Sequence, residues 1–485
     1  MFGQKVQAIV LAAGKSSRFQ TGKSKLVEMI CGQEMILYST NLLSALHIPT
    51  TVVLGYQKEL IENIITKKHG NAVDFIHQQE QHGTGHAVAC TQKKWHKEHI
   101  LVMNGDMPLV KEETILQLYK QHIEKDAAIS FVTACCADSE HSYGRVITRG
   151  QTVEIIESKE FNGPKDESCT INAGIYVIKK EFLHDTINEI EKSKVTKEFY
   201  LTDLVRIASD QEMIIGTVNA PFDQIRGINN LQELWAAEQI KRAELIKYWM
   251  EKGVRFGIAH SVHLDLDITI GAGTRIGCAV HINKGARIGK QCVIEQNSKI
   301  ENSVLEDNVT IYPNTVIHNS YVSTGAQVGP FAHVRQNTII KEDVQVGNFV
   351  ELKNTVLAKG SKVKHLSYLG DALIGQNVNI GAGTITCNFN GVTKHKTTIK
   401  DNVFIGSNNT LVAPVTIHEG SFTAAGSTIT EDIPKDALAI SRTRQINKEN
   451  YAPKLKARYE QAQDQEESHA FIAAKANESS KTGPV

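Results

Sequence analysis

Hydrophobic and polar positions follow two different patterns along the chain, and the change between them falls near residue 230. Before it, short apolar runs at residues 7–11, 51–54 and 100–103 alternate with longer stretches, such as 35–46 and 112–124, whose apolar residues have helical spacing. Short apolar runs between helices are typical of a parallel sheet that is covered on both faces. Ligands of such sheets bind beyond the carboxyl ends of the strands, so we look for chemistry there.

Residues 230–253 have a third character. Apolar residues such as Leu231, Leu245 and Trp249 lie among many Glu, Lys and Arg, and neither Pro nor Gly interrupts the segment before Gly253. This pattern predicts a long helix that connects two domains.

From residue 268 onward, aliphatic residues recur at every sixth position. The first run comprises Ile270, Ile276, Ile282, Ile288, Ile294 and Ile300. One-residue slips begin the later runs at Leu305, Val322 and Leu357, and after an interruption the beat resumes from Ile399 to Ile429. An α-helix cannot place every sixth residue on one face, whereas three short strands per coil can. The spacing therefore predicts a triangular solenoid with its aliphatic side chains directed inward.

Composition narrows the function. The chain has 53 basic and 53 acidic residues, and this zero net charge argues against binding to nucleic acid or to a membrane surface. Its eight cysteines include no C-x-x-C pair, so neither a disulfide framework nor a zinc site is indicated. The first apolar run, residues 6–13, is too short to span a bilayer, and a cytoplasmic location is expected. The tail from residue 447 has few large apolar residues, and we expect a partly helical segment whose last dozen residues are disordered.

Two motifs of the first half suit a bound nucleotide. The strand at residues 6–11 runs into Ala12, Ala13 and Gly14, small residues that let the backbone approach a phosphate or a base, with Arg18 and Lys25 following. The P-loop pattern does not fit, because Ile9 stands where its first glycine would be needed. In the second motif, Asp106 follows the strand 101–103, a position suited to holding Mg²⁺.

Together these motifs resemble the sugar-nucleotidyltransferases. The resemblance extends to Gln78, Gly83–His86, Gly105–Asp106, Tyr143–Arg145, Glu157, Asn172–Gly174 and Gly227–Asn230. With the six-residue repeat behind them, the chain is similar over residues 5–445 to the bifunctional N-acetylglucosamine-1-phosphate uridylyltransferase/glucosamine-1-phosphate acetyltransferases. The resemblance implies an α/β plus all-β chain: a Rossmann-like nucleotidyltransferase domain (1–230), a linker helix (231–252), a left-handed parallel β-helix (253–446) and a tail (447–485). It also implies the joining of UMP from UTP to N-acetylglucosamine-1-phosphate.

The family's site residues transfer position by position to the first domain. Uracil and ribose are expected against Leu11, Ala12, Ala13, Gly14, Gln78, Gly83 and Thr84. The sugar and ribose pocket is expected to contain Asn104, Gly105, Asp106, Gly144, Glu157, Asn172 and Asn229. Arg18 and Lys25 would neutralise phosphate charge, and Asp106 and Asn229 would hold Mg²⁺. Two residues depart from the family: Ser24 replaces a frequent proline, and Asn104 replaces a tyrosine found in some relatives.

The second domain has its own candidate site. Residues 380–396 interrupt the hexad rhythm, and Lys353, His365, Tyr368 and Asn379 lie just before that loop. Histidine suits proton removal from a sugar amine near neutral pH, and His365 lies among the cations and amides that a sugar phosphate requires. The resemblance assigns sugar-phosphate binding to Arg335, Lys353, Tyr368, Asn379 and Asn388. It assigns acetyl-CoA to Ala382, Asn388, Phe389, Ser407, Ala425 and Arg442, with Phe389 in the place of a common tyrosine.

A solenoid side is flat, so a pocket there needs another wall. The loop 386–396 would supply it by reaching a neighbouring chain, and the resemblance likewise implies a homotrimer with shared acetyltransferase sites. Two alternatives stay open. One is a nucleotidyltransferase of single activity with a structural or regulatory β-helix, and the other is a scaffold without catalysis, for which Gly14, Lys25, Asp106 and Asn229 would be superfluous.

Overall fold

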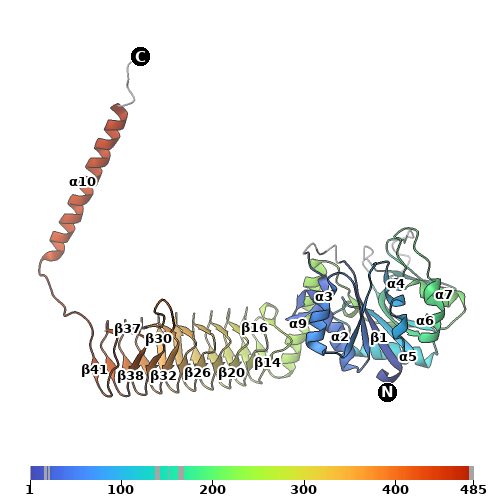
Figure 1. Ribbon diagram of the computed structural model, residues 1–485, viewed down its shortest axis with the longest axis horizontal. Coiled ribbons are helices and arrows are strands. Elements are labelled where there is room, and N and C mark those ends of the chain that lie inside the picture. The colour runs from blue at the N-terminus through green and yellow to red at the C-terminus, as the bar shows by residue number, and fades with distance from the viewer. Residues whose placement is uncertain are drawn as a thin grey trace, which may run out of the picture.

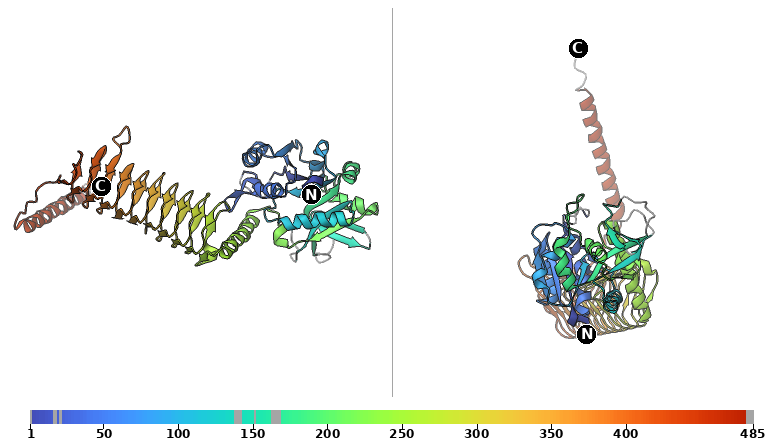
Figure 2. Two further views of the ribbon diagram at one scale, coloured as in Figure 1. Left: turned by 90° about the horizontal axis from the view of Figure 1, so that it is seen from below. Right: turned by 90° about the vertical axis from the view of Figure 1, so that its right-hand side faces the viewer.

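A computed structural model of the chain describes residues 2–15, 19, 22–136, 143–150, 152–161 and 169–479. The molecule is elongated, with a globular N-terminal domain at one end, a straight solenoid in the middle and the helix α10 (Tyr451–Ser479) at the other end (Figure 1). Figure 2 shows that α10 projects from the body, and its side chains are exposed as far as residue 475. The helix reaches further than expected from the composition, since residues 474–479 belong to it; residues 480–485 lie outside the described part. Among the described residues, no helix has both the length and the apolar character needed to cross a membrane.

The N-terminal domain is built on a sheet of strand order β11-β7-β10-β6-β1-β4-β5. These strands are β1 (Val6–Ala12), β4 (Thr50–Leu54), β5 (Val73–His77), β6 (His99–Asn104), β7 (Ile129–Cys135), β10 (Thr170–Lys179) and β11 (Ile215–Asn219). The pairs β1–β4, β1–β6, β4–β5 and β7–β11 are parallel, as predicted. However, β10 runs antiparallel to both β6 and β7, which a pattern of buried apolar positions cannot reveal. The sheet is therefore mixed. A ribbon of β8 (Arg145–Arg149) and β9 (Thr152–Ile156) continues from β10.

Helices cover both faces of this sheet, and alternate strand residues serve the two faces. Val10 and Leu101 belong to one core and Ile9 and Ile100 to the other. The first core receives residues of α2 (Met35–Ala45), α3 (Lys58–His69) and α5 (Glu112–Glu124). The second receives residues of α4 (Thr84–Ala89), α6 (Lys180–Thr186) and α7 (Asp203–Asp210). The prediction of buried strands between two helical layers is confirmed.

The helix α9 (Leu231–Glu251) follows the sheet. Its N-cap is Asn230, whose side chain accepts a hydrogen bond of 2.8 Å from the backbone N–H of Glu233. Near its start Ala237 is buried in the N-terminal domain, while near its end Ile246 is buried in the core of the solenoid. The helix α9 thus contributes side chains to a core of the N-terminal domain and to the core of the solenoid.

The solenoid has three flat sides, each a parallel sheet. The first side has 11 strands from β12 (Arg255–Phe256) to β41 (Leu438–Ala439), the second has ten from β13 (His263–Leu264) to β40 (Thr428–Ile429), and the third has nine from β14 (Thr269–Ile270) to β38 (Val415–Ile417). Partner residues on neighbouring coils are 18 positions apart, as for Ile276 and Ile294, or 17 where a slip occurs, as for Ile288 and Leu305.

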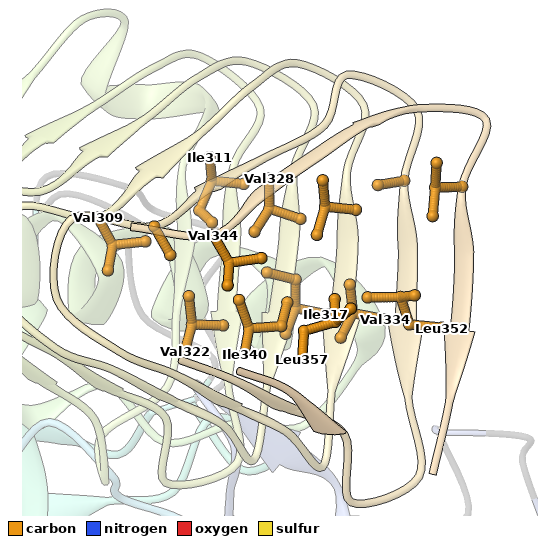
Figure 3. Close-up of a cluster of buried hydrophobic side chains, with 14 of the residues drawn as sticks. Val309, Ile311, Ile317, Val322, Val328, Val334, Ile340, Val344, Leu352 and Leu357 are labelled. Carbon is orange, nitrogen blue, oxygen red and sulfur yellow. The ribbon is translucent and has the colours of Figure 1, made fainter. Parts of the chain in front are cut away.

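The predicted inward ladder of aliphatic residues is the core of the solenoid. Figure 3 shows Ile317, Val334 and Leu352 stacked in one file, and none of these three side chains is exposed to solvent. The chain turns the corners with residues of positive φ, among them Asn302, Asn319 and Asn354. Asparagine tolerates this left-handed conformation better than most residues do.

Candidate functional sites

A cavity of about 650 Å³ opens at the carboxyl ends of β1 and β6. Its lining includes ten predicted nucleotide-site residues: Leu11, Ala12, Ala13, Gly14, Lys25, Gln78, Gly83, Thr84, Asn104 and Asp106. A narrower cavity of about 200 Å³ adjoins it and is lined by Gly144, Glu157, Asn172 and Asn229. The two cavities share Leu11, Thr84, Asn104 and Asp106, so they are continuous. We name them the nucleotide cavity and the sugar cavity, after the predictions for the residues that line them. Gly105 lies behind the wall, where its N–H donates to Leu11 O at 2.9 Å.

Lys25 connects the two predicted metal ligands. It begins the short 3₁₀ helix η2 (Lys25–Val27), and its Nζ donates to Asp106 Oδ2 and, at 3.0 Å, to Asn229 Oδ1. The carboxylate and amide oxygens therefore converge on one positively charged point. Asp106 reaches it from the end of β6, and Asn229 from the residues just before α9, which places the three groups at the junction of both cavities.

The loop before Lys25 is held without a proline. Ser24 has φ −63°, which proline also adopts, but its backbone N–H donates to Gln57 Oε1 at 2.8 Å. Its hydroxyl group accepts a bond from the N–H of Leu26 and so caps η2. Serine thus obtains by hydrogen bonding the loop position that the ring of proline would favour. Arg18, the other predicted phosphate ligand, lies outside the described residues.

Close backbone packing shapes the far wall of the nucleotide cavity. Gly83 has φ +102°, and a Cβ atom there would lie 2.5 Å from Phe199 O. The next residue, Thr84, begins α4 and accepts a hydrogen bond of 3.0 Å from the N–H of Leu201. Gln78 lies beside Gly83: its Nε2 donates to Gly83 O at 3.4 Å and bonds to His86 Nδ1 at 2.8 Å, so its amide is held in place at the cavity.

The sugar cavity is polar and partly buried. Glu157 accepts a hydrogen bond of 3.0 Å from Thr202, and burial raises the pKa of its carboxyl group above the ordinary value. Asn172 accepts from the N–H of Gly174 at 3.1 Å and donates to the hydroxyl group of Tyr176 at 2.6 Å. These two bonds fix the orientation of the Asn172 amide at the bulge of β10.

Asn104 contacts a glycine at the bulge of β10. A Cβ atom at Gly174, where φ is +74°, would lie 2.8 Å from Asn104 Nδ2. The side chain of Asn104 therefore packs directly over that backbone and lines both cavities. An asparagine fills the position at which some relatives carry tyrosine.

One edge of the solenoid carries four of the six predicted acetyl-CoA residues: Ala382, Ser407, Ala425 and Arg442. His365 ends β30 (Lys362–His365), at the corner between the first and second sides, and Asn348 on the preceding coil bonds to its Nδ1 at 3.0 Å. Backbone hydrogen bonds join each corner to the next: Gly383 N to His365 O at 3.4 Å, Asn408 N to Ala382 O at 2.6 Å and Gly426 N to Ser407 O at 2.8 Å. A line therefore runs from His365 through Ala382, Ser407 and Ala425 toward Arg442. At about 4.8 Å per coil, it spans roughly 20 Å.

The next corner carries a buried polar cluster. Lys353 Nζ contacts both carboxylate oxygens of Asp371, at 2.9 and 3.1 Å, and the two side chains are only 8% and 12% exposed. Asn354 and Asn388 also donate to Asp371. Burial acts to raise the pKa of Asp371, but the bonds from Asn354, Lys353 and Asn388 outweigh it and hold the pKa below its ordinary value. A further cation, Lys394, lies against Lys353, which lowers the pKa of Lys394.

The other predicted sugar-phosphate residues are spread over two sides. Arg335 lies beside Lys353 on the second side and bonds to Glu351 through Nε and Nη2, at 2.8 and 2.7 Å. Tyr368, at the start of β31 (Tyr368–Gly370), shares this side. Asn379 instead begins β33 (Asn379–Ile380) on the first side.

The interruption of the hexads is a loop, as predicted. Ile374 pairs with Ile399, an offset of 25 residues in place of 18, and the extra residues project from the solenoid (Figure 2). The loop closes on itself through a hydrogen bond of 2.7 Å from the N–H of His395 to Asn388 O. At its base Asn388 is buried, whereas the ring of Phe389 is 57% exposed.

Comparisons with known proteins cover nearly the whole chain. Residues 8–152 match the MobA-like NTP transferase domain, 247–352 the EIF2B subunit epsilon LbH domain and 317–419 the GMPPB C-terminal domain. The bifunctional protein GlmU of Thermodesulfovibrio yellowstonii is 39% identical over 457 residues, which cover 93% of this chain and 99% of the relative. The chain belongs to the GlmU family. The GlmU proteins of Clostridioides difficile (36% identity, 94% of this chain and 99% of the relative) and Shouchella clausii (37%, 92% and 98%) match in the same way.

Membership of the GlmU family decides between the alternatives left open by the sequence. The chain is a bifunctional enzyme of UDP-N-acetylglucosamine biosynthesis, with a nucleotidyltransferase domain and a left-handed β-helical acetyltransferase domain. A nucleotidyltransferase of single activity and a scaffold without catalysis are both excluded.

Sequence reasoning missed three residues of the polar cluster: Asn354, Asp371 and Lys394. Asp371 was not singled out, although it lies 18 residues after Lys353 and 17 before Asn388, the spacing of one coil. That spacing is the signal that would have found it. Lys394 was seen only as part of the loop, and its position against Lys353 depends on how the loop folds back.

Proposed function

We propose that the residues around Lys25, Asp106 and Asn229 carry uridylyl transfer. The supporting observation is that the nucleotide and sugar cavities meet at these three groups. The phosphate of N-acetylglucosamine-1-phosphate attacks the α-phosphorus of UTP, and pyrophosphate leaves along the backbone at Gly14 and Lys15. The nucleophile is already anionic, so the protein needs to position the two substrates and neutralise charge rather than remove a proton.

Mg²⁺ fits this site. The carboxylate of Asp106 and the amide oxygen of Asn229 are the hard ligands this ion prefers, and both already face one cationic group, Lys25 Nζ. Mg²⁺ usually takes one or two ligands from the protein and its other ligands from phosphate and water. The bound ion would supply positive charge to the triphosphate. Lys25, whose Nζ bonds to both oxygens, would release them to the ion and contact phosphate itself.

For the second activity, we assign proton removal to His365. Asn348 orients the imidazole through Nδ1, which leaves Nε2 to accept the proton of the glucosamine-1-phosphate amine. The line of corners that begins at His365 and continues through Ala382 toward Arg442 would bind the extended arm of acetyl-CoA. Lys353, Lys394 and Arg335 form the cationic group to which a sugar phosphate would bind.

A homotrimer would complete the acetyltransferase site. His365 lies at one corner and Lys353 at the next, and up to about 16 Å of extended chain joins them. Asn379 lies on the first side, and we infer that a second chain closes the pocket around a small sugar phosphate. Three-fold symmetry would repeat the contact identically. We place the enzyme in the cytoplasm, where UTP and acetyl-CoA are available together.

The test uses the full chain with glucosamine-1-phosphate, acetyl-CoA, UTP and Mg²⁺, and follows thiol and pyrophosphate release separately. Asp106→Ala should abolish pyrophosphate release and spare acetyl transfer. His365→Ala should lower acetyl transfer by about 10²–10⁴-fold and spare uridylyl transfer from supplied N-acetylglucosamine-1-phosphate. The exposed residues Asp74 and His418 provide matched alanine controls. Loss of both activities in a folded single variant would contradict two separate sites.

Shared acetyltransferase sites have a separate test. Chains with His365→Ala are mixed with chains with Asn388→Ala under conditions that exchange subunits. If sites combine residues of two chains, mixed trimers regain part of the acetyl transfer that neither parent shows. A monomeric mass by light scattering, or no recovery in oligomers shown to be mixed, would exclude shared sites.

A further inference from the structure

Three of the eight cysteines meet where β7 ends and β10 begins. Cys135 is the last residue of β7 and pairs in register with Thr170, and the N–H of Cys136 donates to Cys169 O at 2.8 Å. Cys136 points into the hydrophobic core, whereas Cys135 and Cys169 are both exposed. The thiol groups of Cys135 and Cys169 lie within hydrogen-bonding reach of each other, a contact that raises the pKa of Cys135.

This pair is adjacent to the sugar cavity without lining it. Three residues after Cys169, Asn172 donates its backbone N–H to Gly144 O at 2.9 Å, and both of these residues line the cavity. Glu157, a third lining residue, lies in the chain segment between the two cysteines. A covalent link between them would therefore close a loop that carries part of the sugar site.

We propose that Cys135 and Cys169 form a modification site, at which a low-molecular-weight disulfide oxidises them to an intramolecular disulfide that weakens uridylyl transfer. The sulfur of Cys169 attacks one sulfur of the reagent, forming a mixed disulfide and releasing one thiol. Cys135 then attacks the Cys169 sulfur and releases the second thiol, so two electrons and two protons pass to the reagent. Reversible disulfides of this kind act as redox sensors in reducing compartments.

The effect on the sugar site follows from bond length. An S–S bond is about 2.05 Å long, which is shorter than the hydrogen-bonding separation of two thiols, so its formation draws the two sulfur atoms together. The shift acts on the first residues of β10, next to the bond between Asn172 and Gly144. Because a misplacement of about 1 Å can cost up to about 10²-fold in rate, we expect kcat/KM for N-acetylglucosamine-1-phosphate to fall by about tenfold. This consequence rests on the proposed sugar site, whereas the chemistry of the two thiols does not.

The test treats the full-length protein with oxidised glutathione, counts free thiols, maps linked peptides and assays both activities. We expect two of the eight thiols to be lost, a Cys135–Cys169 linked peptide, weaker uridylyl transfer, unchanged acetyl transfer and full reversal by dithiothreitol. Cys135→Ser and Cys169→Ser should each abolish the link and the inhibition. Cys136→Ala, a matched control at the neighbouring buried thiol, should behave as wild type.

Each contrary outcome would refute a different part of the proposal. No Cys135–Cys169 peptide, or equal inhibition of Cys135→Ser and wild type, would refute the modification site. A linked peptide with unchanged uridylyl transfer would refute control of the sugar site. If the reduced enzyme released no pyrophosphate at all, the proposed uridylyl site would fail, yet the peptide map would still decide the chemistry of the thiols.

Discussion

Asp371→Asn removes one negative charge from the buried polar cluster of the solenoid while preserving the shape of the side chain. Lys353 bonds to both carboxylate oxygens, Asn354 donates to Oδ1 and Asn388 donates to Oδ2. An asparagine presents an NH₂ group in place of one oxygen. In either orientation that NH₂ group faces hydrogen-bond donors, and Lys353 loses its counter-charge.

The expected loss is large for one atom. Removing one partner of a buried ion pair typically costs about 3–5 kcal/mol. Because the side chains of Lys353 and Asp371 keep 8% and 12% of their exposure, we expect the lower end, about 3 kcal/mol. Adding Lys353→Met should recover part of this loss, since the remaining buried charge is then removed as well.

The assay is urea unfolding of the full chain, with hydrogen exchange at the amides of β28 (Glu351–Lys353) and β31 as a local probe. Asp343→Asn is the matched control, because Asp343 also has positive φ but forms an exposed pair with Lys359 at 4.0 Å. Such a pair contributes less than about 1 kcal/mol. Similar small losses in both variants would refute the argument that the cluster depends on a buried charge.

The pKa shift of Asp371 also predicts how the loss of stability in Asp371→Asn changes with pH. The folded-state pKa of Asp371 is depressed, so its stabilisation is present above the unfolded-state value near 3.8 and is lost as pH falls through the folded-state pKa. The difference in unfolding free energy between wild type and Asp371→Asn should therefore be constant near neutral pH and shrink below pH 3.8. A difference that grows on acidification would contradict this sign.

Three further predictions concern the two cores and the nucleotide site. Ile288→Asp should give insoluble or unfolded protein because it buries an unpaired charge, whereas the exposed Lys290→Asp should be tolerated; equal solubility of the two would contradict the inward ladder. Burial lowers the pKa of His122 to about 3, so protonation of this residue in the unfolded chain should destabilise the first domain as pH falls from 6.5. Urea unfolding should therefore show a smaller loss of unfolding free energy between pH 7 and pH 5 for His122→Gln than for wild type. Gly83→Ala should cost about 1–3 kcal/mol and weaken UTP binding, whereas Gly150→Ala, with positive φ but open space, should cost less and leave the KM for UTP unchanged.

The solenoid was the more predictable half. Its aliphatic spacing placed residues such as Ile317 and Val334 in the core, because every coil repeats the same burial. The one-residue slips were readable too, and they appear as 17-residue offsets between coils. The direction of β10 was not predictable, since apolar alternation is the same in parallel and antiparallel strands.

The sequence predicted which residues line the two cavities of the first domain, but not how their side chains contact one another. The motifs named most of the residues that line the nucleotide and sugar cavities, yet nothing in them shows Lys25 joined to both Asp106 and Asn229. Asp371 was not predicted as a site residue, because its role depends on a corner of positive φ that turns its carboxylate toward Lys353. Contacts of this kind are made by residues one coil apart, so they follow from register rather than from a local motif.

The linker helix α9 also determines where the two halves of the enzyme can be separated. The strands β12, β13 and β14 begin the three sides of the solenoid, so their outer edges carry backbone groups with no preceding coil. Leu245, Ile246 and Trp249 of α9 pack against the core at this end. A fragment that starts at residue 253 would lack α9 and would expose three unpaired strand edges, which can pair with other chains and cause aggregation. A fragment that starts at residue 230 would keep α9 over these edges. The helix that joins the two domains thus also caps the N-terminal end of the β-helix.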